Sequence, residues 1–241
     1  MLTGICNLSV IPMRSEATHK AEMTNQILFG ESFIIDKVKS EWSQVTLIHD
    51  SYSGWIENKQ FTEFDSINDN YYVCNKLNEK ISINNSEQQL VLGSLIPLSI
   101  DINNKLKLKL RNKPKTLVKD DIKKISLKYL NSPYLWGGRT PLGIDCSGLV
   151  QMVFRQLGYK FPRDSHEQEK VGNTINNLNY VKTGDLAFFG EKKITHVGII
   201  LENNTIIHAS GKVKIDSLNS KGIIDENKIC THKLKSIKRV I

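Results

Sequence analysis

The residues best placed to do chemistry are Asp145-Cys146-Ser147-Gly148, which directly precede the apolar run Leu149–Phe154. This order predicts a cysteine in the first turn of an amphipathic helix. A helix N-terminus carries roughly half a positive charge and unpaired N–H groups, which favour a thiolate over a thiol. Because a thiolate is a strong nucleophile for acyl transfer, Cys146 is the candidate nucleophile.

Two histidines follow downstream, each in a segment that has the composition of a β-strand. His196 lies in Ile194–Ile199 and His208 in Ile206–Ser210, with the candidate turn Glu202-Asn203-Asn204 between them. In an antiparallel hairpin two such side chains can meet on one face. A lone cysteine or histidine among apolar residues is more often a core residue, but cysteine, histidine and a third polar residue follow the chain order of papain-like enzymes.

Six segments give the C-terminal half a resemblance to the NlpC/P60 family of bacterial cell-wall cysteine peptidases. In the family's order they are Tyr134–Gly138, Asp145–Gly148, Arg163–Ser165, Thr183–Leu186, His196–Ile199 and Ile207–Ser210. The resemblance covers residues 120–241 and implies an α+β, papain-like domain in which helices that carry the cysteine pack on an antiparallel sheet that carries the histidines. It also implies cleavage of peptidoglycan stem peptides, usually between D-glutamate and the following diamino acid.

The chemistry assigns the three polar residues separate roles. Cys146 attacks the scissile carbonyl, and His196 takes the thiol proton and returns it to the leaving amine. His208 hydrogen-bonds the far nitrogen of His196 and fixes its tautomer. The backbone N–H of Cys146 and a second donor hold the oxyanion; Tyr134 is a candidate for that donor, or else a half-buried aromatic packed on the helix. The histidine and cysteine spacings fit no metal motif, so we expect no metal or cofactor.

One group within the family is a closer match, the γ-D-glutamyl-L-diamino acid endopeptidases that recycle muropeptides. The match rests on the segment Pro12–Met23, on Tyr52–Trp55 and on Arg163–Ser165. It implies a cleft that accepts only stem peptides with a free N-terminal L-alanine. An acylated alanine would leave a buried carboxylate without its cation, which costs several kcal/mol.

Five further residues are implied in that cleft. Asp164 would bind the α-ammonium of the alanine, Ser165 and Ser147 would line the same subsites, and Glu16 and Tyr52 from the N-terminal domain would close the pocket. Simpler interpretations stay open. Asp164 and Ser165 could cap a helix over residues 166–171, Glu16 could be a surface charge, and Tyr52 a barrel core aromatic.

The region before the catalytic segment is rich in predicted strands. Residues 1–65 resemble a bacterial SH3 domain, and the expected strands of this small barrel are Ile5–Ile11, Ser32–Val38, Trp42–Leu47 and Gly54–Ile56. Alternation over residues 66–115 predicts a second SH3-like barrel that ends in a linker at Asn112–Lys115. The NlpC/P60-like domain, residues 116–241, then begins with a helix near Leu117.

Composition limits the classes of partner. The 241 residues carry a net charge of +8 and are 39% hydrophobic, which is typical of a globular chain. The lysines are dispersed without interleaved aromatic residues, so we expect no nucleic acid partner. The four cysteines lack paired spacing, which argues against a disulfide framework. We expect a monomer that acts on a peptidoglycan-derived peptide.

The sequence shows no pattern typical of a membrane helix or a secretion signal. No apolar run reaches the roughly 18 residues of a membrane helix, so we expect no membrane association. The segment Met1–Val10 resembles the start of a strand more than a secretion signal. These features favour the cytoplasm; a leader upstream of this sequence would instead indicate an extracytoplasmic location.

Two rival functions come from other classes. The same cysteine and histidines could serve a thiol amidase or acyltransferase that acts on another amide; Tyr134 and Asp164-Ser165 argue against it because they match a peptide-amine pocket. A non-catalytic cell-wall-binding module could keep the fold. The intact set of Cys146, His196 and His208 argues against that class.

Overall fold

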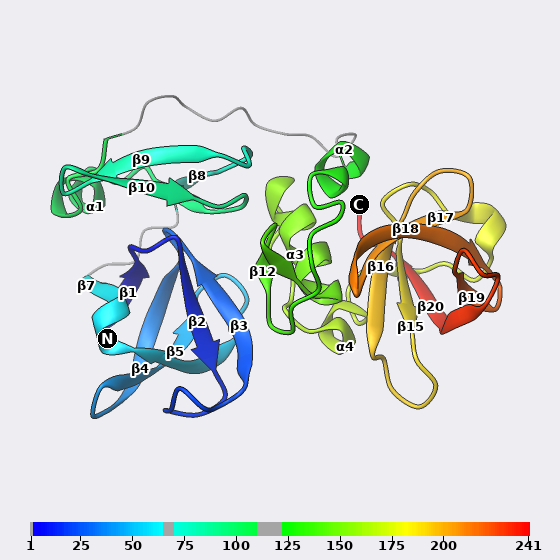
Figure 1. The fold of residues 1–241 in the computed structure, drawn as a ribbon, viewed down its shortest axis with the longest axis horizontal. Coiled ribbons are helices and arrows are strands. Elements are labelled where there is room, and N and C mark those ends of the chain that lie inside the picture. Colours follow the sequence, from blue (N-terminus) through cyan, green and yellow to red (C-terminus); the bar gives the residue numbers. More distant parts are fainter. Residues whose placement is uncertain (1, 65–69, 110–121) are drawn as a thin grey trace. The chain divides into compact units, whose positions relative to one another are not determined.

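The computed structural model describes residues 2–64, 70–109 and 122–241 (Figure 1). The chain forms two compact units. The first comprises Met1–Thr116 and Trp136–Thr140, and the second comprises Leu117–Leu135 and Pro141–Ile241. Within the described residues, every helix is too short or too polar to span a membrane.

The first unit is built on a curled antiparallel sheet with the strand order β3-β2-β6-β5-β4-β1-β7. The strands are β1 (Thr3–Cys6), β2 (Val10–Arg14), β3 (Met23–Leu28), β4 (Ser32–Lys39), β5 (Trp42–Leu47), β6 (Ser53–Glu57) and β7 (Phe61–Phe64), with the 3₁₀ turn η1 (Asn58–Gln60) before the last. Alternate side chains point inward and form a buried core of Cys6, Ile11, Met13, Ile27, Phe33, Ile35, Val45, Leu47 and Ile56. The predicted strand-rich N-terminal barrel is confirmed.

One expected strand of this barrel is wrong. The segment Ile5–Ile11 is not continuous, because residues 7–9 form a bend between β1 and β2. The two halves pair with different neighbours: β1 lies between β4 and β7, whereas β2 lies between β3 and β6. The apolar pattern runs through both halves, so it gives no sign of the break.

The rest of the first unit differs from the expected second barrel. Over the described residues 70–109 the strands pair only as two-stranded sheets, β8 (Tyr71–Val73) with β11 (Leu95–Pro97) and β9 (Glu79–Ile83) with β10 (Ser86–Leu90). The helix α1 (Ile100–Lys105) follows. Their buried side chains share one cluster with Ile5, Phe29 and Phe64, so they pack on residues of the barrel in a second cluster, separate from the barrel core. The predicted linker at 112–115 lies outside the described residues.

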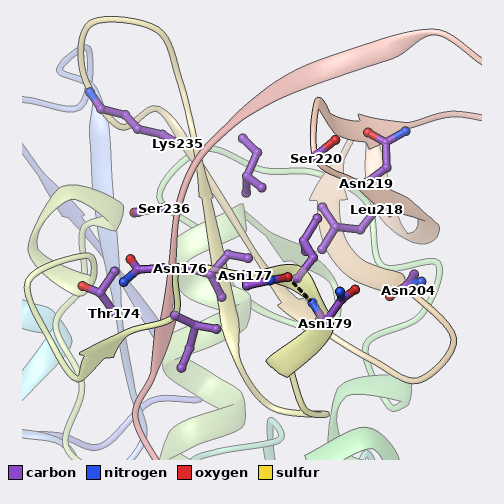
Figure 2. Close-up of a pocket in the computed structure, with 14 residues that line it drawn as sticks. Thr174, Asn176, Asn177, Asn179, Asn204, Leu218, Asn219, Ser220, Lys235 and Ser236 are labelled. Carbon is purple, nitrogen blue, oxygen red and sulfur yellow. Dashed lines mark hydrogen bonds between the residues drawn. The ribbon is translucent and has the colours of Figure 1, made fainter.

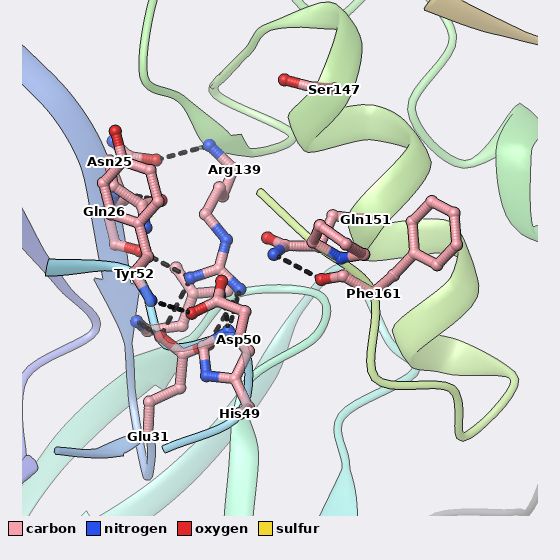
Figure 3. Close-up of polar contacts among 12 residues, drawn as sticks. Asn25, Gln26, Glu31, His49, Asp50, Tyr52, Arg139, Ser147, Gln151 and Phe161 are labelled. Atoms are coloured by element: carbon pink, nitrogen blue, oxygen red, sulfur yellow. Dashed lines mark hydrogen bonds and ion pairs between the residues drawn. The ribbon is translucent and has the colours of Figure 1, made fainter. Parts of the chain in front are cut away.

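A buried cation lies in the first unit. Arg139, on β12 (Arg139–Thr140), donates from both terminal nitrogens to the carboxylate of Glu31, at 3.0 and 2.9 Å. Its Nη1 also donates to the Gln26 carbonyl at 2.7 Å. Figure 3 shows His49 and Asp50 beside this pair, with His49 Nε2 at 3.0 Å from Asp50. Both side chains of the Arg139–Glu31 pair are fully buried.

Removing this cation should destabilise the first unit. We expect Arg139→Ala to lower its free energy of unfolding by about 3–5 kcal/mol, because Glu31 stays buried without its main cation. Denaturant unfolding followed by tryptophan fluorescence measures this unit, since all three tryptophans, Trp42, Trp55 and Trp136, belong to it. Lys80→Ala, which breaks an exposed pair with Glu87, is the control. A loss below about 1 kcal/mol for Arg139→Ala would contradict a role for the buried pair.

The second unit combines short helices with a closed sheet (Figure 1). Its helical elements are α2 (Ile122–Leu127), α3 (Cys146–Gln156), α4 (Ser165–Gln168) and the 3₁₀ turn η3 (Leu178–Tyr180). Its strands are β13 (Gly143–Ile144), β14 (Asn173–Thr174), β15 (Leu186–Phe189), β16 (His196–Ile200), β17 (Thr205–Ser210), β18 (Lys212–Asn219), β19 (Gly222–Ile224) and β20 (Cys230–Arg239). The order β14-β20-β15-β16-β17-β18-β19, with β19 also paired to β20, closes six strands into a barrel.

Alternation along the strands separates two apolar layers. Ile200 and Ile206 belong to the barrel core together with Phe189, while the odd-numbered Val197 and Ile199 of β16 are buried on the opposite face. Helix α3 packs on β16 and β17, and α2 packs on α3. The predicted arrangement of helices on an antiparallel sheet is confirmed.

Candidate active site

Two histidines meet at one end of the barrel interior. His196 begins β16 and His208 lies in β17, both on the inner face that Ile200 and Ile206 continue. His196 Nε2 lies 2.8 Å from His208 Nδ1. Gly198 makes this possible, because a Cβ at that position would stand 3.0 Å from the Cβ of His208.

A carboxylate on the next strand fixes the tautomers of both rings. Asp216 Oδ2 accepts from His208 Nε2 at 3.0 Å and from Lys214 Nζ at 3.0 Å. Because His208 donates its Nε2–H to Asp216, its Nδ1 carries no proton and must accept the Nε2–H of His196. The lone pair of His196 is then on Nδ1, the nitrogen that a base needs. Sequence analysis missed Asp216; its only signal is the alternation Lys214, Asp216, Leu218 along β18.

The cysteine lies beside the first of these histidines. Cys146 is the first residue of α3, whose N-cap Asp145 accepts from the Gly148 N–H at 2.7 Å. The backbone N–H of Val197, the residue after His196, hydrogen-bonds the sulfur. This contact brings the thiol to the start of β16, where His196 lies, so the structure joins the three predicted catalytic residues at one place.

A buried arginine holds the turn that carries the cysteine. Arg163 donates to both carboxylate oxygens of Asp145, at 3.0 and 2.6 Å, and to Ser147 Oγ at 2.9 Å. Gln168 Nε2 donates to the carbonyl of Ser147 at 2.9 Å. The hydroxyl of Ser147 therefore belongs to this network. Arg163 stands in a predicted motif, but sequence analysis did not assign it this role.

The electrostatics of the site favour an uncharged Cys146 thiol beside an uncharged His196 ring before the reaction. Burial raises the pKa of Cys146 to about 12, and Asp145 adds to the rise against the Val197 N–H and Arg163. Burial, and then His232 and His208, lower the pKa of His196 well below 6.5. The effect of burial on the pKa of Cys146 thus outweighs that of the helix N-terminus, which was expected to favour the thiolate. His196 must take the proton while the sulfur attacks.

This balance predicts the pH dependence. The base is lost when pH falls through the pKa of His196, so we expect the acid limb of kcat/KM to lie below pH 6.5. The high pKa of Cys146 predicts no plateau in its alkylation by iodoacetamide as pH rises from neutrality toward 9. Both rates can be measured against pH on the same preparation. An acid limb above pH 6.5, or alkylation that is already maximal at neutral pH, would contradict the uncharged pair.

Tyr134 lies in the same place. A cavity of about 320 Å³ is lined by Tyr134, Thr195, His196, Ala209, Ser210, Gly211 and His232. Burial raises the pKa of Tyr134 to about 12, with Cys146 and Asp145 adding to it. The phenol therefore keeps its proton and can donate to an oxyanion beside the cysteine, which remains its predicted role.

The remaining predicted binding residues fall in two groups. Asp164 occupies the N-cap position of α4 without a capping bond from its side chain, and Ser165 begins that helix. The helix is shorter than the expected 166–171, because its last turn closes with the tighter bond from Val171 N–H to the Gln168 carbonyl. Glu16 and Tyr52 belong to the first unit, so their part in a cleft stays a prediction. Glu16 is exposed after β2, and Tyr52 packs on the barrel core.

A larger pocket of about 690 Å³ lies elsewhere in the second unit (Figure 2). Its lining residues are Thr174, Ile175, Asn176, Asn177, Leu178, Asn179, Asn204, Leu218, Asn219, Ser220, Leu234, Lys235, Ser236 and Ile237. Asn204 is in the turn that joins β16 to β17, at the opposite end of these strands from His196. Because the lining includes no histidine, cysteine or carboxylate, this pocket offers none of the chemistry described above.

Comparisons with known proteins agree with this geometry. Residues 131–230 match the model of the NlpC/P60 family, and residues 13–61 match that of the bacterial dipeptidyl-peptidase SH3 domain. The chain contains an NlpC/P60 domain. The predicted combination of this NlpC/P60 domain with an N-terminal bacterial SH3 domain is confirmed.

Two relatives and one solved structure resemble most of the chain. A γ-D-glutamyl-L-lysine dipeptidyl-peptidase of Bacillus subtilis is 29% identical, over 85% of this chain and 78% of the relative. A protein with the same name from Bacillus cereus is 27% identical, over 87% and 74%. The crystal structure of an NlpC/P60 family protein from Bacillus cereus matches over 99% of both chains, with a TM-score of 0.78 and 19% identity. That similarity shows that the fold is shared.

Proposed function

We propose that this protein is a cysteine endopeptidase that hydrolyses the bond between γ-D-glutamate and the following diamino acid in peptidoglycan stem peptides. The observation that carries the proposal is the chain from Cys146 at the start of α3 to His196, His208 and Asp216, in which each ring nitrogen has a fixed role. The two relatives named for cleavage after γ-D-glutamate, similar over 85% and 87% of this chain, support the bond assigned.

The acylation step follows from the tautomers. Sγ of Cys146 attacks the γ-carbonyl carbon of D-glutamate while Nδ1 of His196 takes the thiol proton. The imidazolium is stabilised by its Nε2–H bond to His208, which Asp216 orients. The N–H of Cys146, with Tyr134 as the second predicted donor, holds the oxyanion. His196 then returns the proton to the leaving amine of the diamino acid.

In deacylation a water molecule takes the place of the thiol as the nucleophile that gives its proton to His196. Neutral His196 takes a proton from a water molecule that attacks the thioester carbonyl. The C–S bond breaks, the thiolate of Cys146 recovers the proton from His196, and L-Ala-D-Glu leaves with a free γ-carboxylate. The cycle consumes one water and releases two products.

The reaction can be tested on L-Ala-γ-D-Glu-L-Lys with products identified by mass spectrometry. We expect L-Ala-D-Glu and free L-Lys. A second reaction with an added amine acceptor separates hydrolysis from acyl transfer. Cleavage between alanine and glutamate, or transfer to the amine in place of hydrolysis, would overturn the proposal. Binding to purified sacculi without turnover would favour the non-catalytic class.

We also propose that Asp164 selects peptides with a free N-terminal amine. Asp164 directly follows Arg163, whose two hydrogen bonds to Asp145 fix the segment next to the turn that carries Cys146. Asp164 occupies the N-cap position of α4, and a carboxylate near a cleft is stabilised by an ammonium ligand. The predicted roles of Ser165, Glu16 and Tyr52 in the same pocket accompany this proposal.

The selectivity predicts the behaviour of Asp164→Asn. Wild-type protein should prefer L-Ala-γ-D-Glu-L-Lys to its N-acetyl form by about 100-fold or more in kcat/KM, and Asp164→Asn should reduce that ratio about tenfold or more. The measurement is kcat/KM for both peptides. Glu167→Gln, which removes an exposed carboxylate of the same helix, should leave the ratio unchanged. An equal loss on both peptides would count against a role in amine recognition. The cytoplasmic location and the monomeric state stay predictions.

A further inference from the structure

A third histidine lies against the catalytic pair. His232 is on β20, and its ring stacks on the ring of His196 with centroids 4.1 Å apart and planes 27° apart. It meets His208 at 5.8 Å and 77°. His232 also lines the cavity that contains Tyr134 and His196. The residue belongs to none of the sequence motifs.

We propose that His232 is a positioning residue, which holds the plane of the His196 ring by stacking and allows His196 to act as a base only while His232 itself is uncharged. The inference rests on the proposed function in taking His196 as the base.

The stacking supplies a restraint that the hydrogen bond cannot. His208 makes one hydrogen bond to Nε2 of His196 and a ring contact at 5.0 Å and 87°, so its ring does not stack on the His196 ring. A parallel ring at 4.1 Å blocks rotation of the His196 ring from one face. His196 is only 5% exposed and His208 is fully buried, so water has little access to the bond between them. A base whose Nδ1 stays aimed at the thiol reacts faster, since misplacements of about 1 Å can cost two orders of magnitude in rate.

The charge condition follows from what surrounds His232. On its own strand, Thr231 Oγ1 lies 2.9 Å from Nδ1, and β19 contributes the apolar Ile223 opposite it. From β18, Lys214 disfavours a charge on His232 and Asp216 favours one, and burial lowers the pKa most. The other titratable neighbours are His196, His208 and Tyr134. A protonated His232 would place a cation against the ring that must itself become cationic during catalysis.

Two substitutions separate stacking from charge. His232→Phe keeps a flat ring that cannot be protonated, while His232→Ala removes both features. At neutral pH we expect His232→Ala to lower kcat about 10- to 100-fold with KM changed less than about twofold. His232→Phe should keep kcat within about threefold of wild type. The acid limb of the pH–rate profile of His232→Phe should lie at lower pH than that of the wild type. It should reflect the binding of one proton, whereas the wild-type limb reflects the binding of two.

Each result decides the matter. Wild-type kcat in His232→Ala, or no recovery in His232→Phe, would overturn the stacking role. A higher KM at unchanged kcat would instead make His232 a substrate contact. An unchanged acid limb in His232→Phe would overturn the charge condition. His166→Phe, a change of an exposed histidine on α4, should match wild type throughout.

A second readout needs no peptide. The rate at which iodoacetamide alkylates Cys146 depends on proton removal by His196, so its pH profile should respond to the two His232 variants in the same order. A Cys230→Ser background removes the exposed cysteine, and peptide mapping identifies the site. If wild-type protein cleaves no stem peptide but alkylation responds in this order, the proposed function fails while the role of His232 stands.

Discussion

Replacing His196 by alanine is expected to lower kcat/KM for L-Ala-γ-D-Glu-L-Lys by about 10⁴-fold or more. Burial raises the pKa of Cys146 to about 12, so little thiolate exists without a base that takes the proton. His208 does not substitute easily, because its bond to Asp216 holds it in place. The loss should appear in kcat, since His196 acts on the thiol and the leaving amine during the chemical steps.

The control for this variant is His166→Ala, because His166 is exposed on α4. Circular dichroism and a thermal melt should show the same fold for both variants. Activity of His196→Ala within about tenfold of wild type would mean that another group serves as the base.

Changing Asp216 to asparagine is expected to lower kcat/KM about 10²- to 10³-fold, although the two side chains are nearly equal in shape. Asp216 accepts hydrogen bonds from both His208 and Lys214. Both bonds run to the same oxygen, Oδ2, so the amide oxygen of asparagine can keep them while the negative charge is lost. The positive charge of Lys214 is then unbalanced and disfavours the imidazolium that His196 must form during catalysis.

A double variant tests this explanation of the loss. Lys214→Met removes the unbalanced cation, so Lys214→Met/Asp216→Asn leaves no net charge beside His208. We expect kcat/KM of this double variant to be at least about tenfold higher than that of Asp216→Asn. Lys214→Met alone should stay within about threefold of wild type. If the double variant is no better than Asp216→Asn, the unbalanced charge of Lys214 is not the cause of the loss.

The catalytic core was accessible from the sequence because its signals are local. A helix-capping aspartate before Cys146 and two histidines on either side of a tight turn specify which elements carry them and on which face. One strand was predicted with the bounds that the structure has, Trp42–Leu47. Polar and apolar residues are interleaved in it, and turn residues flank it.

The residues that support the catalytic ones were not accessible, because they depend on pairing between distant strands. Asp216 reaches His208 through the register of β17 with β18. His232 reaches His196 because β20 pairs with β15 and closes the barrel. A histidine or aspartate on a polar strand edge has many uses, and nothing in its own segment distinguishes these. Arg163 is similar, since its partner Asp145 is 18 positions away.

The region after the first barrel shows a different limit. Alternation in this region indicates strands with one buried face, but it does not say which core buries that face. In the structure Ile81 and Leu90 pack in the same cluster as Phe29 and Phe64. A short hairpin lacks the area to enclose a core of its own, so docking on an existing core is the more stable arrangement.

The most direct test of the account compares wild-type protein with Cys146→Ala on L-Ala-γ-D-Glu-L-Lys, with free L-Lys and L-Ala-D-Glu quantified by mass spectrometry. The account predicts that wild type releases both products in equal amounts and that Cys146→Ala, folded as judged by its thermal melt, releases neither above the uncatalysed background. Release of L-Ala-D-Glu by Cys146→Ala at the wild-type rate would contradict the assignment of Cys146 as the nucleophile, and with it the mechanism built on His196, His208 and Asp216.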